Sequence, residues 1–145
     1  MEENSKQIQR SKNMSAIRSV SKLEENVSKA LWHRGLRIRR NVRSLYGVPD
    51  FSLKKYKMVI FIDSCFWHAC PVHGNRPKKN FEFWDKKLKR NIERDKEVTN
   101  YYTDNNWNIL RVWEHDLKKD FEGTVDEIAF FIKKSKLENI KKRSY

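Results

Sequence analysis

The chain has 145 residues, with 32 Lys and Arg side chains against 19 Asp and Glu, a formal net charge of +13 and two cysteines. Its length fits one compact domain, and five Trp, eight Phe and five Tyr are too many large apolar groups for a disordered basic tail. Two cysteines exclude a dense disulfide framework, residues 1–11 lack the apolar core of a signal peptide, and the longest apolar run, Met58–Ile62, is too short to span a bilayer. We therefore expect a folded cytosolic protein with no membrane partner.

The positive charge is concentrated in the first two thirds of the chain. Residues 1–100 carry 23 basic and 11 acidic side chains, whereas residues 101–145 carry 9 and 8. This distribution favours a binding face for a polyanion, most simply nucleic acid, because phosphates attract Lys and Arg. A solubilising surface or contact with acidic lipid is the alternative.

The first half of the chain predicts a helix and three strands. Ser21-Lys-Leu-Glu24 has the pattern of a capping box and predicts a helix over residues 22–34 that ends near a glycine. The alternating segment Leu36–Val42 predicts a strand. Asp50–Leu53 and Met58–Ile62 predict a hairpin, and the uninterrupted apolar second strand is expected at the centre of the sheet.

The second half continues with a loop, helices and one strand. Residues 63–79 have no periodicity and are predicted to form a loop, whereas residues 80–103 return to helical spacing. Asn108–Trp113 predicts a strand. A second capping box, Thr124–Glu127, is expected to open the last helix, and the end, Lys136–Tyr145, is expected to fray. The order describes a small α/β domain.

Four residues have the chemistry and the spacing of a zinc site. Four residues separate Cys65 from Cys70 and two separate Cys70 from His73, so one loop can place three ligands around a tetrahedral ion. His115, just beyond the strand that ends at Trp113, could supply the fourth. The alternative is two cytosolic thiols and two surface histidines, but a loop without apolar periodicity favours a metal that holds it.

Two aspartates are predicted at strand ends. Asp50 precedes one strand of the hairpin and Asp63 follows the other, so antiparallel pairing could bring both carboxylates to one edge of the sheet. Paired oxygen ligands suit Mg²⁺, which can polarise a phosphodiester. The spacing Pro-Asp-x12-Asp-x-Cys is similar to that of the PD-(D/E)xK nucleases without the usual Lys. Such aspartates are also common as caps and turns.

Several further motifs occur together and in order. They are Arg10-Ser-Lys-Asn-Met14, Gly47-Val-Pro-Asp-Phe51, Val59-Ile-Phe61, Cys65-Phe-Trp-His68, Cys70-Pro-Val-His-Gly74, Phe83-Trp84, Asn91-Ile-Glu-Arg-Asp95, Trp107 and Val112-Trp-Glu114. Together these motifs closely resemble the very-short-patch-repair (Vsr) DNA mismatch endonucleases over roughly residues 9–133. The resemblance implies a restriction-endonuclease-like fold, a mixed central sheet flanked by helices with a structural Zn²⁺ site. It also implies a Mg²⁺-dependent nick 5′ to the thymine of a T:G mismatch left by deamination of 5-methylcytosine.

The resemblance assigns roles to acidic residues and to one histidine. Asp50 falls at the family's Mg²⁺-binding aspartate, and the backbone carbonyl of Ile62 matches its second protein ligand. His68 matches the general base, a role that suits an ordinary histidine pKa near 6.5. Two further acids, Glu24 and Asp95, match residues that organise metal-bound waters or orient the histidine. Asp63 occupies a position that varies between His and Asp, so its role stays open.

Aromatic and basic residues are implied to contact DNA. Phe66, Trp67 and Trp84 match a wedge inserted between base pairs beside the mismatch, where a weakened step lowers the cost of unstacking. Trp84 also shares helical spacing with Leu88, so packing in the core is its alternative role. The N-terminal segment is implied to lie against DNA and to become ordered on binding; otherwise it is a solvated end. Its candidate contacts are Arg10, Lys12, Asn13, Met14 and Arg18.

One departure concerns the metal site. The fourth zinc ligand of the family is commonly Cys, and here the matching residue is His115. Because imidazole replaces thiolate readily in zinc sites, we expect the metal to persist. If His115 does not bind the metal, we expect a water or a neighbouring side chain to complete the site. The expected organisation is a basic DNA-contacting arm over residues 1–20, an endonuclease domain over 21–135 and a basic tail over 136–145.

The leading hypothesis is therefore a monomeric mismatch-nicking endonuclease of the bacterial nucleoid, with Mg²⁺ and Zn²⁺ as cofactors. Its partners are double-stranded DNA, mismatch-repair proteins and a companion cytosine-5 methyltransferase. The alternatives are a restriction-type nuclease of similar fold with another target, and a zinc-stabilised DNA-binding module without catalysis.

Overall fold

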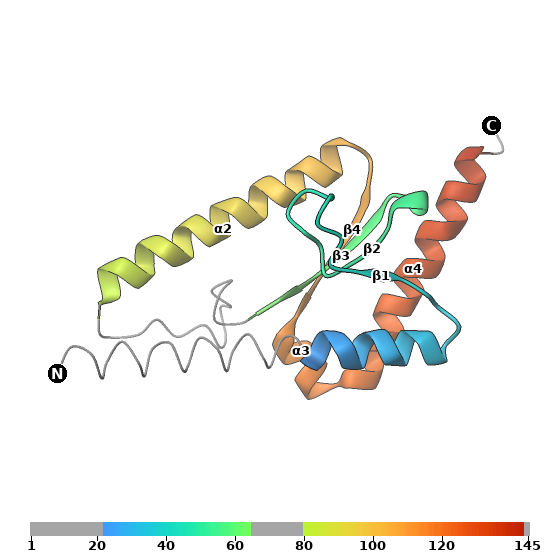
Figure 1. Cartoon of the computed structure of the whole chain (residues 1–145), viewed down its shortest axis with the longest axis horizontal. Helices are drawn as coiled ribbons and strands as arrows, with labels where there is room; N and C mark the ends of the chain where they lie inside the picture. Colours follow the sequence, from blue (N-terminus) through green and yellow to red (C-terminus); the bar gives the residue numbers. More distant parts are fainter. Residues whose placement is uncertain (1–21, 65–79, 144–145) are drawn as a thin grey trace.

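The computed structural model describes residues 22–64 and 80–143 (Figure 1). A helix over residues 22–33 comes first, and after α2 the chain passes through one strand into two further helices. The remaining elements are β1 (Arg39–Arg40), β2 (Phe51–Leu53), the short 3-10 helix η1 (Lys54–Tyr56), β3 (Met58–Asp63), α2 (Phe81–Asp104), β4 (Asn108–Trp113), α3 (Glu114–Lys119) and α4 (Phe121–Arg143).

The sheet is mixed and has the order β1-β2-β3-β4. β1 and β2 pair antiparallel, as do β2 and β3, whereas β3 and β4 run parallel. All six residues of β3 are buried, which confirms the prediction that this apolar strand forms the centre of the sheet. Because β3 and β4 are parallel and in register from Met58–Asn108 to Asp63–Trp113, their carboxyl ends lie at the same edge.

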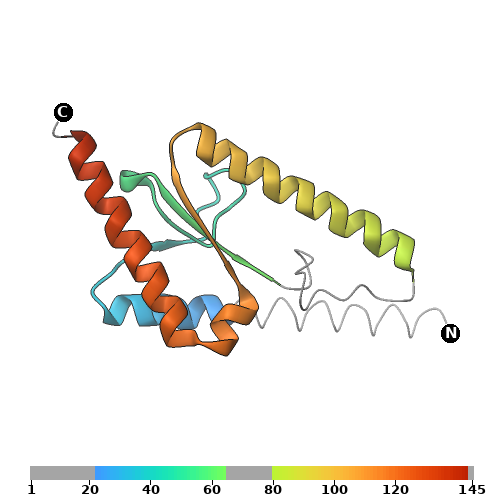
Figure 2. The same ribbon diagram turned by 180° about the vertical axis from the view of Figure 1, so that it is seen from behind.

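Helices cover both faces of the sheet, as the two opposite views show (Figures 1 and 2). On one face, Ile60 and Ile62 of β3 join a large apolar cluster with the helix over residues 22–33 and with α4. On the other face, Val59 and Phe61 join a smaller cluster with Val98 and Tyr102 of α2. This mixed sheet between helical layers fits the restriction-endonuclease-like fold expected from the sequence. Among the described residues, no helix combines the length and the hydrophobicity that a membrane crossing requires.

Most predicted elements are confirmed. The first helix, the hairpin, the long helix α2 and the strand Asn108–Trp113 lie within about two residues of their predicted ranges. The strand expected over residues 36–42 is wrong in extent, because only Arg39–Arg40 pairs with β2. Asn41 then adopts a positive φ of 50°, which ends the strand.

Two predictions about the last helix are wrong. α4 begins at Phe121, because the carboxylate of Asp120 accepts a hydrogen bond from the Gly123 backbone N–H at 3.0 Å and caps the helix there. Thr124 lies inside the helix, where its hydroxyl donates to the carbonyl of Asp116. Residues 136–143 continue α4 rather than fray.

A tight turn before β2 places Asp50. Gly47 has a φ of 74°, and a Cβ atom at this position would lie 2.7 Å from Cγ1 of Val98 on α2. The hydroxyl of Tyr102, also on α2, donates to the carbonyl of Tyr46. Only glycine therefore lets the turn approach α2 this closely, and the turn delivers Asp50 to the sheet edge where β3 ends.

Candidate functional site

Carboxylates gather at the edge of the sheet where β3 ends. Asp50 directly precedes β2, and Asp63 is the last residue of the antiparallel neighbour β3. The charge of Asp63 acts on the titration of Asp50, so the two carboxylates lie near each other. Glu24 reaches the same edge from the helix over residues 22–33. The proximity of Asp50 and Asp63 predicted from antiparallel pairing is therefore confirmed.

Asp50 is held by its neighbours and carries a strongly perturbed pKa. Its Oδ2 accepts a hydrogen bond from the backbone N–H of Ile62 at 2.6 Å, and its side chain shares a hydrogen bond with Glu24. Burial, the hydrogen bond with Glu24 and the negative charges of Glu24 and Asp63 raise the pKa of Asp50 to about 8, although the Ile62 N–H opposes the shift. Burial and the neighbouring acids therefore disfavour the ionised form of Asp50.

Glu24 connects this edge to β1. Its carboxylate is mostly buried, and its Oε2 lies 3.6 Å from Nη2 of Arg40, whose side chain is 36% exposed. The position of Glu24 follows from its helix, since Val27 and Leu31 bury the next turns against the sheet. Ser21, the other half of the predicted capping box, lies outside the described residues.

Asp63 has a different environment, because a guanidinium faces it. Its Oδ1 lies 2.8 Å from Nη1 of Arg111 on β4. The same guanidinium donates to the hydroxyl of Thr99 and to the backbone carbonyl of Asp95, at 2.8 and 3.2 Å, and lies over the ring of Phe61 at 4.5 Å from its centroid. Arg111 thereby joins the end of β3 to α2.

The residues at this edge have the chemistry of a magnesium site. Mg²⁺ keeps several waters and uses one or two carboxylates, a role that Asp50 and Glu24 can fill. Burial first, and then the neighbouring acids, raise the pKa of Asp50, and a bound cation would offset both effects. Within residues 22–64 and 80–143, no group of three His, Cys, Asp or Glu side chains could hold a metal ion. A cation here would therefore need further ligands, such as the carbonyl of Ile62.

Other predicted site residues fall in different places. Asp95 lines a cavity of about 260 Å³ beside Asp63, Arg111 and Trp113. Trp84 is only 5% exposed, whereas its neighbour Phe83 is 60% exposed. His115 is the second residue of α3, its ring nearly parallel to that of Trp113 and its Nε2 3.4 Å from Asp116. The predicted residues that lie outside the described part of the chain are Cys65, Phe66, Trp67, His68, Cys70, His73 and the arm residues Arg10, Lys12, Asn13, Met14 and Arg18.

Sequence reasoning missed Arg111, Arg40 and Phe83. Arg111 could have been noticed as the one charged residue within the strand Asn108–Trp113, where burial demands a partner. Arg40 gives no comparable signal, because it is one of several arginines in a basic segment. The exposure of Phe83 depends on how α2 lies on the sheet, which periodicity alone does not fix.

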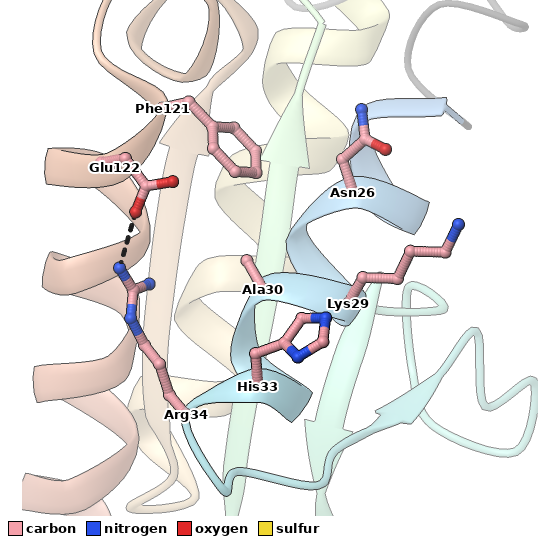
Figure 3. Close-up of a pocket in the computed structure, with 7 residues that line it drawn as sticks. All are labelled: Asn26, Lys29, Ala30, His33, Arg34, Phe121 and Glu122. Carbon is pink, nitrogen blue, oxygen red and sulfur yellow. Dashed lines mark hydrogen bonds and ion pairs between the residues drawn. The ribbon is translucent and has the colours of Figure 1, made fainter.

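A second cavity lies away from this edge (Figure 3). It has a volume of about 450 Å³ and opens between the helix over residues 22–33 and the start of α4. In its wall, Nη2 of Arg34 lies 2.9 Å from a carboxylate oxygen of Glu122, the contact dashed in Figure 3. The same nitrogen lies 2.9 Å from a carboxylate oxygen of Asp126. The cavity contains none of the carboxylates described above. Its lining residues are Asn26, Lys29, Ala30, His33, Arg34, Phe121 and Glu122.

Comparisons with known proteins bear on this geometry. Residues 3–73 match the family model described as "DNA mismatch endonuclease Vsr", a range that contains Glu24, Asp50 and Asp63. The chain is 44% identical to "Type II nicking enzyme V.NaeI" of Lentzea aerocolonigenes, over 80% of this chain and 74% of that one. It is 43% identical to "Type II nicking enzyme V.HpaIIP" of Haemophilus parainfluenzae, over 70% and 74%.

A third relative carries the name of the family itself. The chain is 37% identical to "DNA mismatch endonuclease Vsr" of Escherichia coli (strain K12), over 75% of this chain and 71% of that one. Since these matches cover more than two thirds of both chains at 37% identity or above, the chain belongs to the Vsr family.

Proposed function

We propose that this protein is a DNA mismatch endonuclease that nicks one strand of double-stranded DNA 5′ to the thymine of a T:G mismatch. Such mismatches arise when 5-methylcytosine is deaminated, so the nick would initiate very short patch repair. The protein would act as a monomer in the bacterial cytosol, on DNA modified by a companion cytosine-5 methyltransferase and alongside mismatch-repair proteins.

The names of the relatives carry this proposal. Relatives at 44%, 43% and 37% identity are named as nicking enzymes or as a mismatch endonuclease. The carboxylate edge supports catalysis rather than binding alone, because Asp50 is held in an unfavourable, acid-rich position that a DNA-binding module does not need. The net charge of +13 supports attraction of DNA, with an affinity that falls as salt rises.

The described residues suit a magnesium-dependent mechanism. Asp50 and the carbonyl of Ile62 would hold Mg²⁺, which when bound supplies Lewis-acid polarisation of the scissile phosphodiester. The Ile62 N–H orients the Asp50 carboxylate through the 2.6 Å hydrogen bond, and Glu24 lies beside it to order water. His68 would accept a proton from the attacking water, and Asp95 would help to order water or orient His68.

Two further parts of the proposal concern DNA damage and zinc. Phe66, Trp67 and Trp84 would form the wedge beside the mismatch, with the arm of residues 1–20 against the DNA. Since Trp84 is buried in the DNA-free protein, its insertion would require α2 to shift or the ring to turn on binding.

Zn²⁺ would be held by Cys65, Cys70, His73 and His115, and metal analysis of the purified protein should then find about one Zn per chain.

A nicking assay tests the proposed function. Purified protein with Mg²⁺ should nick a duplex 5′ to the thymine of a T:G mismatch and leave the matched T:A duplex uncut. Cleavage of matched DNA at a particular sequence would instead indicate a restriction-type nuclease. Binding without cleavage in every sequence context would indicate a zinc-stabilised DNA-binding module.

Two variants complete the assay. Asp50→Asn and His68→Ala should each abolish nicking while binding of the T:G duplex persists, because they remove a metal ligand and a base rather than DNA contacts. Nicking equal to that of the wild type in both variants would refute the proposed mechanism.

A further inference from the structure

The two aspartates at the edge of the sheet lie toward different layers of the protein. Successive side chains of a strand alternate between faces, so Asp63 shares the face of Phe61, which packs toward α2. Glu24 comes from the helix on the opposite face, where Ile62 is buried. Asp50 lies between these layers, bonded to the Ile62 N–H and to Glu24. Asp50 is therefore the partner of Glu24, while Asp63 faces α2.

Arg111 has the contacts of a residue held in one position. Its guanidinium reaches Asp63, the hydroxyl of Thr99 and the carbonyl of Asp95, all within 3.2 Å, and covers the ring of Phe61. Its side chain is 21% exposed and that of Asp63 is 8% exposed, so water screens their attraction only weakly. The ion pair is therefore a fixed part of the edge rather than a surface contact.

The charges at this edge are divided unequally as a result. Asp63 has a cation at 2.8 Å, whereas no Lys or Arg among the described residues forms an ion pair with Asp50. Beside Asp50 and Glu24, the described positive charge is that of Arg40. Its Nη2 lies 3.6 Å from Oε2 of Glu24, and its side chain is more exposed than that of Arg111. Among the described residues, Asp50 and Glu24 therefore have less cationic compensation than Asp63.

From this arrangement we propose that Arg111 is a positioning residue of the cleavage site, which takes Asp63 as its counter-ion and so confines the catalytic cation to the Asp50 side. Asp63 acts as the anchor of Arg111 and is not a ligand of the cation. Arg111 also fixes the turn of α2 that carries Asp95 through the Asp95 carbonyl. This inference rests on the magnesium dependence proposed above, and it assigns Asp63 a role that the sequence left open.

Binding of Mg²⁺ to the DNA-free protein, measured by titration calorimetry, tests the inference without relying on activity. Asp63→Asn leaves the positive charge of Arg111 uncompensated and should weaken Mg²⁺ binding by up to about tenfold, whereas Arg111→Gln leaves the negative charge of Asp63 and should strengthen it by a similar factor. The double variant removes both charges and should return to within about twofold of the wild type. Arg111→Lys keeps the charge and should also stay near the wild type.

The nicking assay, with the Mg²⁺ concentration varied, should show the same order of half-saturating concentrations. Asp63→Asn should retain nicking at high Mg²⁺, which a variant lacking a metal ligand cannot do. A matched control is Arg34→Gln, which removes two ion pairs about 15 Å along the helix from Glu24 and should leave Mg²⁺ binding unchanged.

The outcomes separate the inference from the proposed function. If Asp63→Asn and the double variant both lose Mg²⁺ binding as Asp50→Asn does, Asp63 is a ligand and the inference is wrong, although the magnesium mechanism stands. If the wild type neither binds Mg²⁺ nor needs it for nicking, the proposed mechanism itself fails. Equal effects of Arg34→Gln and Arg111→Gln on Mg²⁺ binding would also overturn the inference, since they would show general destabilisation.

Discussion

Two aspartates at one edge of the sheet show how neighbours decide what a carboxylate does. Asp50 lies beside Glu24, and burial together with the acids Glu24 and Asp63 raises the pKa of Asp50 to about 8. Asp63 lies a short distance away with its Oδ1 at 2.8 Å from Arg111. An aspartate side chain is therefore electrostatically unfavourable when ionised at position 50, and it is one partner of an ion pair at position 63. The first environment suits a site that awaits a cation, and the second suits a structural contact.

The largest expected difference between the two regions is in catalysis. Asp50→Asn should lower the rate of nicking by about a thousandfold or more, because a neutral amide holds a divalent cation poorly. Asp63→Asn should lower it by no more than about tenfold at saturating Mg²⁺, since we assign Asp63 to Arg111. Single-turnover rates on a T:G duplex measure both variants. Equal losses of nicking rate in the two variants would show that Asp63 matters for catalysis as much as Asp50 does.

The two substitutions should also change stability in opposite directions. The folded pKa of Asp50, about 8, exceeds its ordinary value of 3.8, so the protonated form is favoured by folding and stability is lost as pH rises from 3.8 through 8. Asp50→Asn removes this loss, and its amide can still donate to Glu24. Without added Mg²⁺ it should therefore raise the free energy of unfolding by roughly 2–5 kcal/mol at pH 8 and by little near pH 4.

Asp63→Asn should instead destabilise the protein by about 1–3 kcal/mol, because it leaves a mostly buried guanidinium without its counter-ion. Urea unfolding at pH 4, 6 and 8 without added Mg²⁺ measures both effects. Added Mg²⁺ should stabilise the wild type at pH 8 and have little effect on Asp50→Asn. A stability difference between Asp50→Asn and the wild type that did not grow with pH would contradict the raised pKa.

The turn before Asp50 allows a smaller test of how this region is positioned. Gly47→Ala should cost about 1–3 kcal/mol, because φ is 74° and the new Cβ would lie 2.7 Å from Val98. Gly35→Ala is a matched control: its φ is 78°, but no atom lies within 4 Å of a Cβ built there, so it shows the backbone cost alone. Thermal unfolding of both variants measures the difference, and nicking should fall further for Gly47→Ala because the turn carries Asp50. Equal losses in both would show that contact with α2 does not constrain the turn.

The two regions also differ in how far the sequence could predict them. The hairpin that carries Asp50 and Asp63 follows from a continuous apolar strand and its short connection, which are local features. The helix that carries Glu24 follows from its apolar spacing and its end at Gly35. The pairing of Asp63 with Arg111 joins residues 48 apart through the parallel neighbour β4, and nothing local indicates that register.

Two local sequence patterns gave wrong element boundaries, because a neighbouring element already used the residues concerned. Thr124–Glu127 has the pattern of a capping box, but Asp120 caps the helix first because α3 ends there and its carboxylate meets the Gly123 N–H. The alternation over residues 36–42 suggested a long strand, yet Leu36 instead closes the preceding helix through its N–H to the Leu31 carbonyl. In both cases a neighbouring element used the residues that the isolated pattern assigned elsewhere.

The smallest expected effect concerns Arg40, which is the described cation on the Asp50 side. Its side chain is 36% exposed and lies 3.6 Å from Glu24, so Arg40→Gln should change the free energy of unfolding by less than about 1 kcal/mol. It should strengthen Mg²⁺ binding by less than about threefold, and this difference should shrink in 0.5 M salt because the pair is partly solvated. Arg39→Gln is the control, since Arg39 is the adjacent strand residue and points to the other face. A larger effect on Mg²⁺ binding for Arg40→Gln than for Arg111→Gln would mean that Arg40 compensates the charge of Glu24 and Asp50 more strongly than Arg111 compensates that of Asp63. That result is the opposite of the assignment made here.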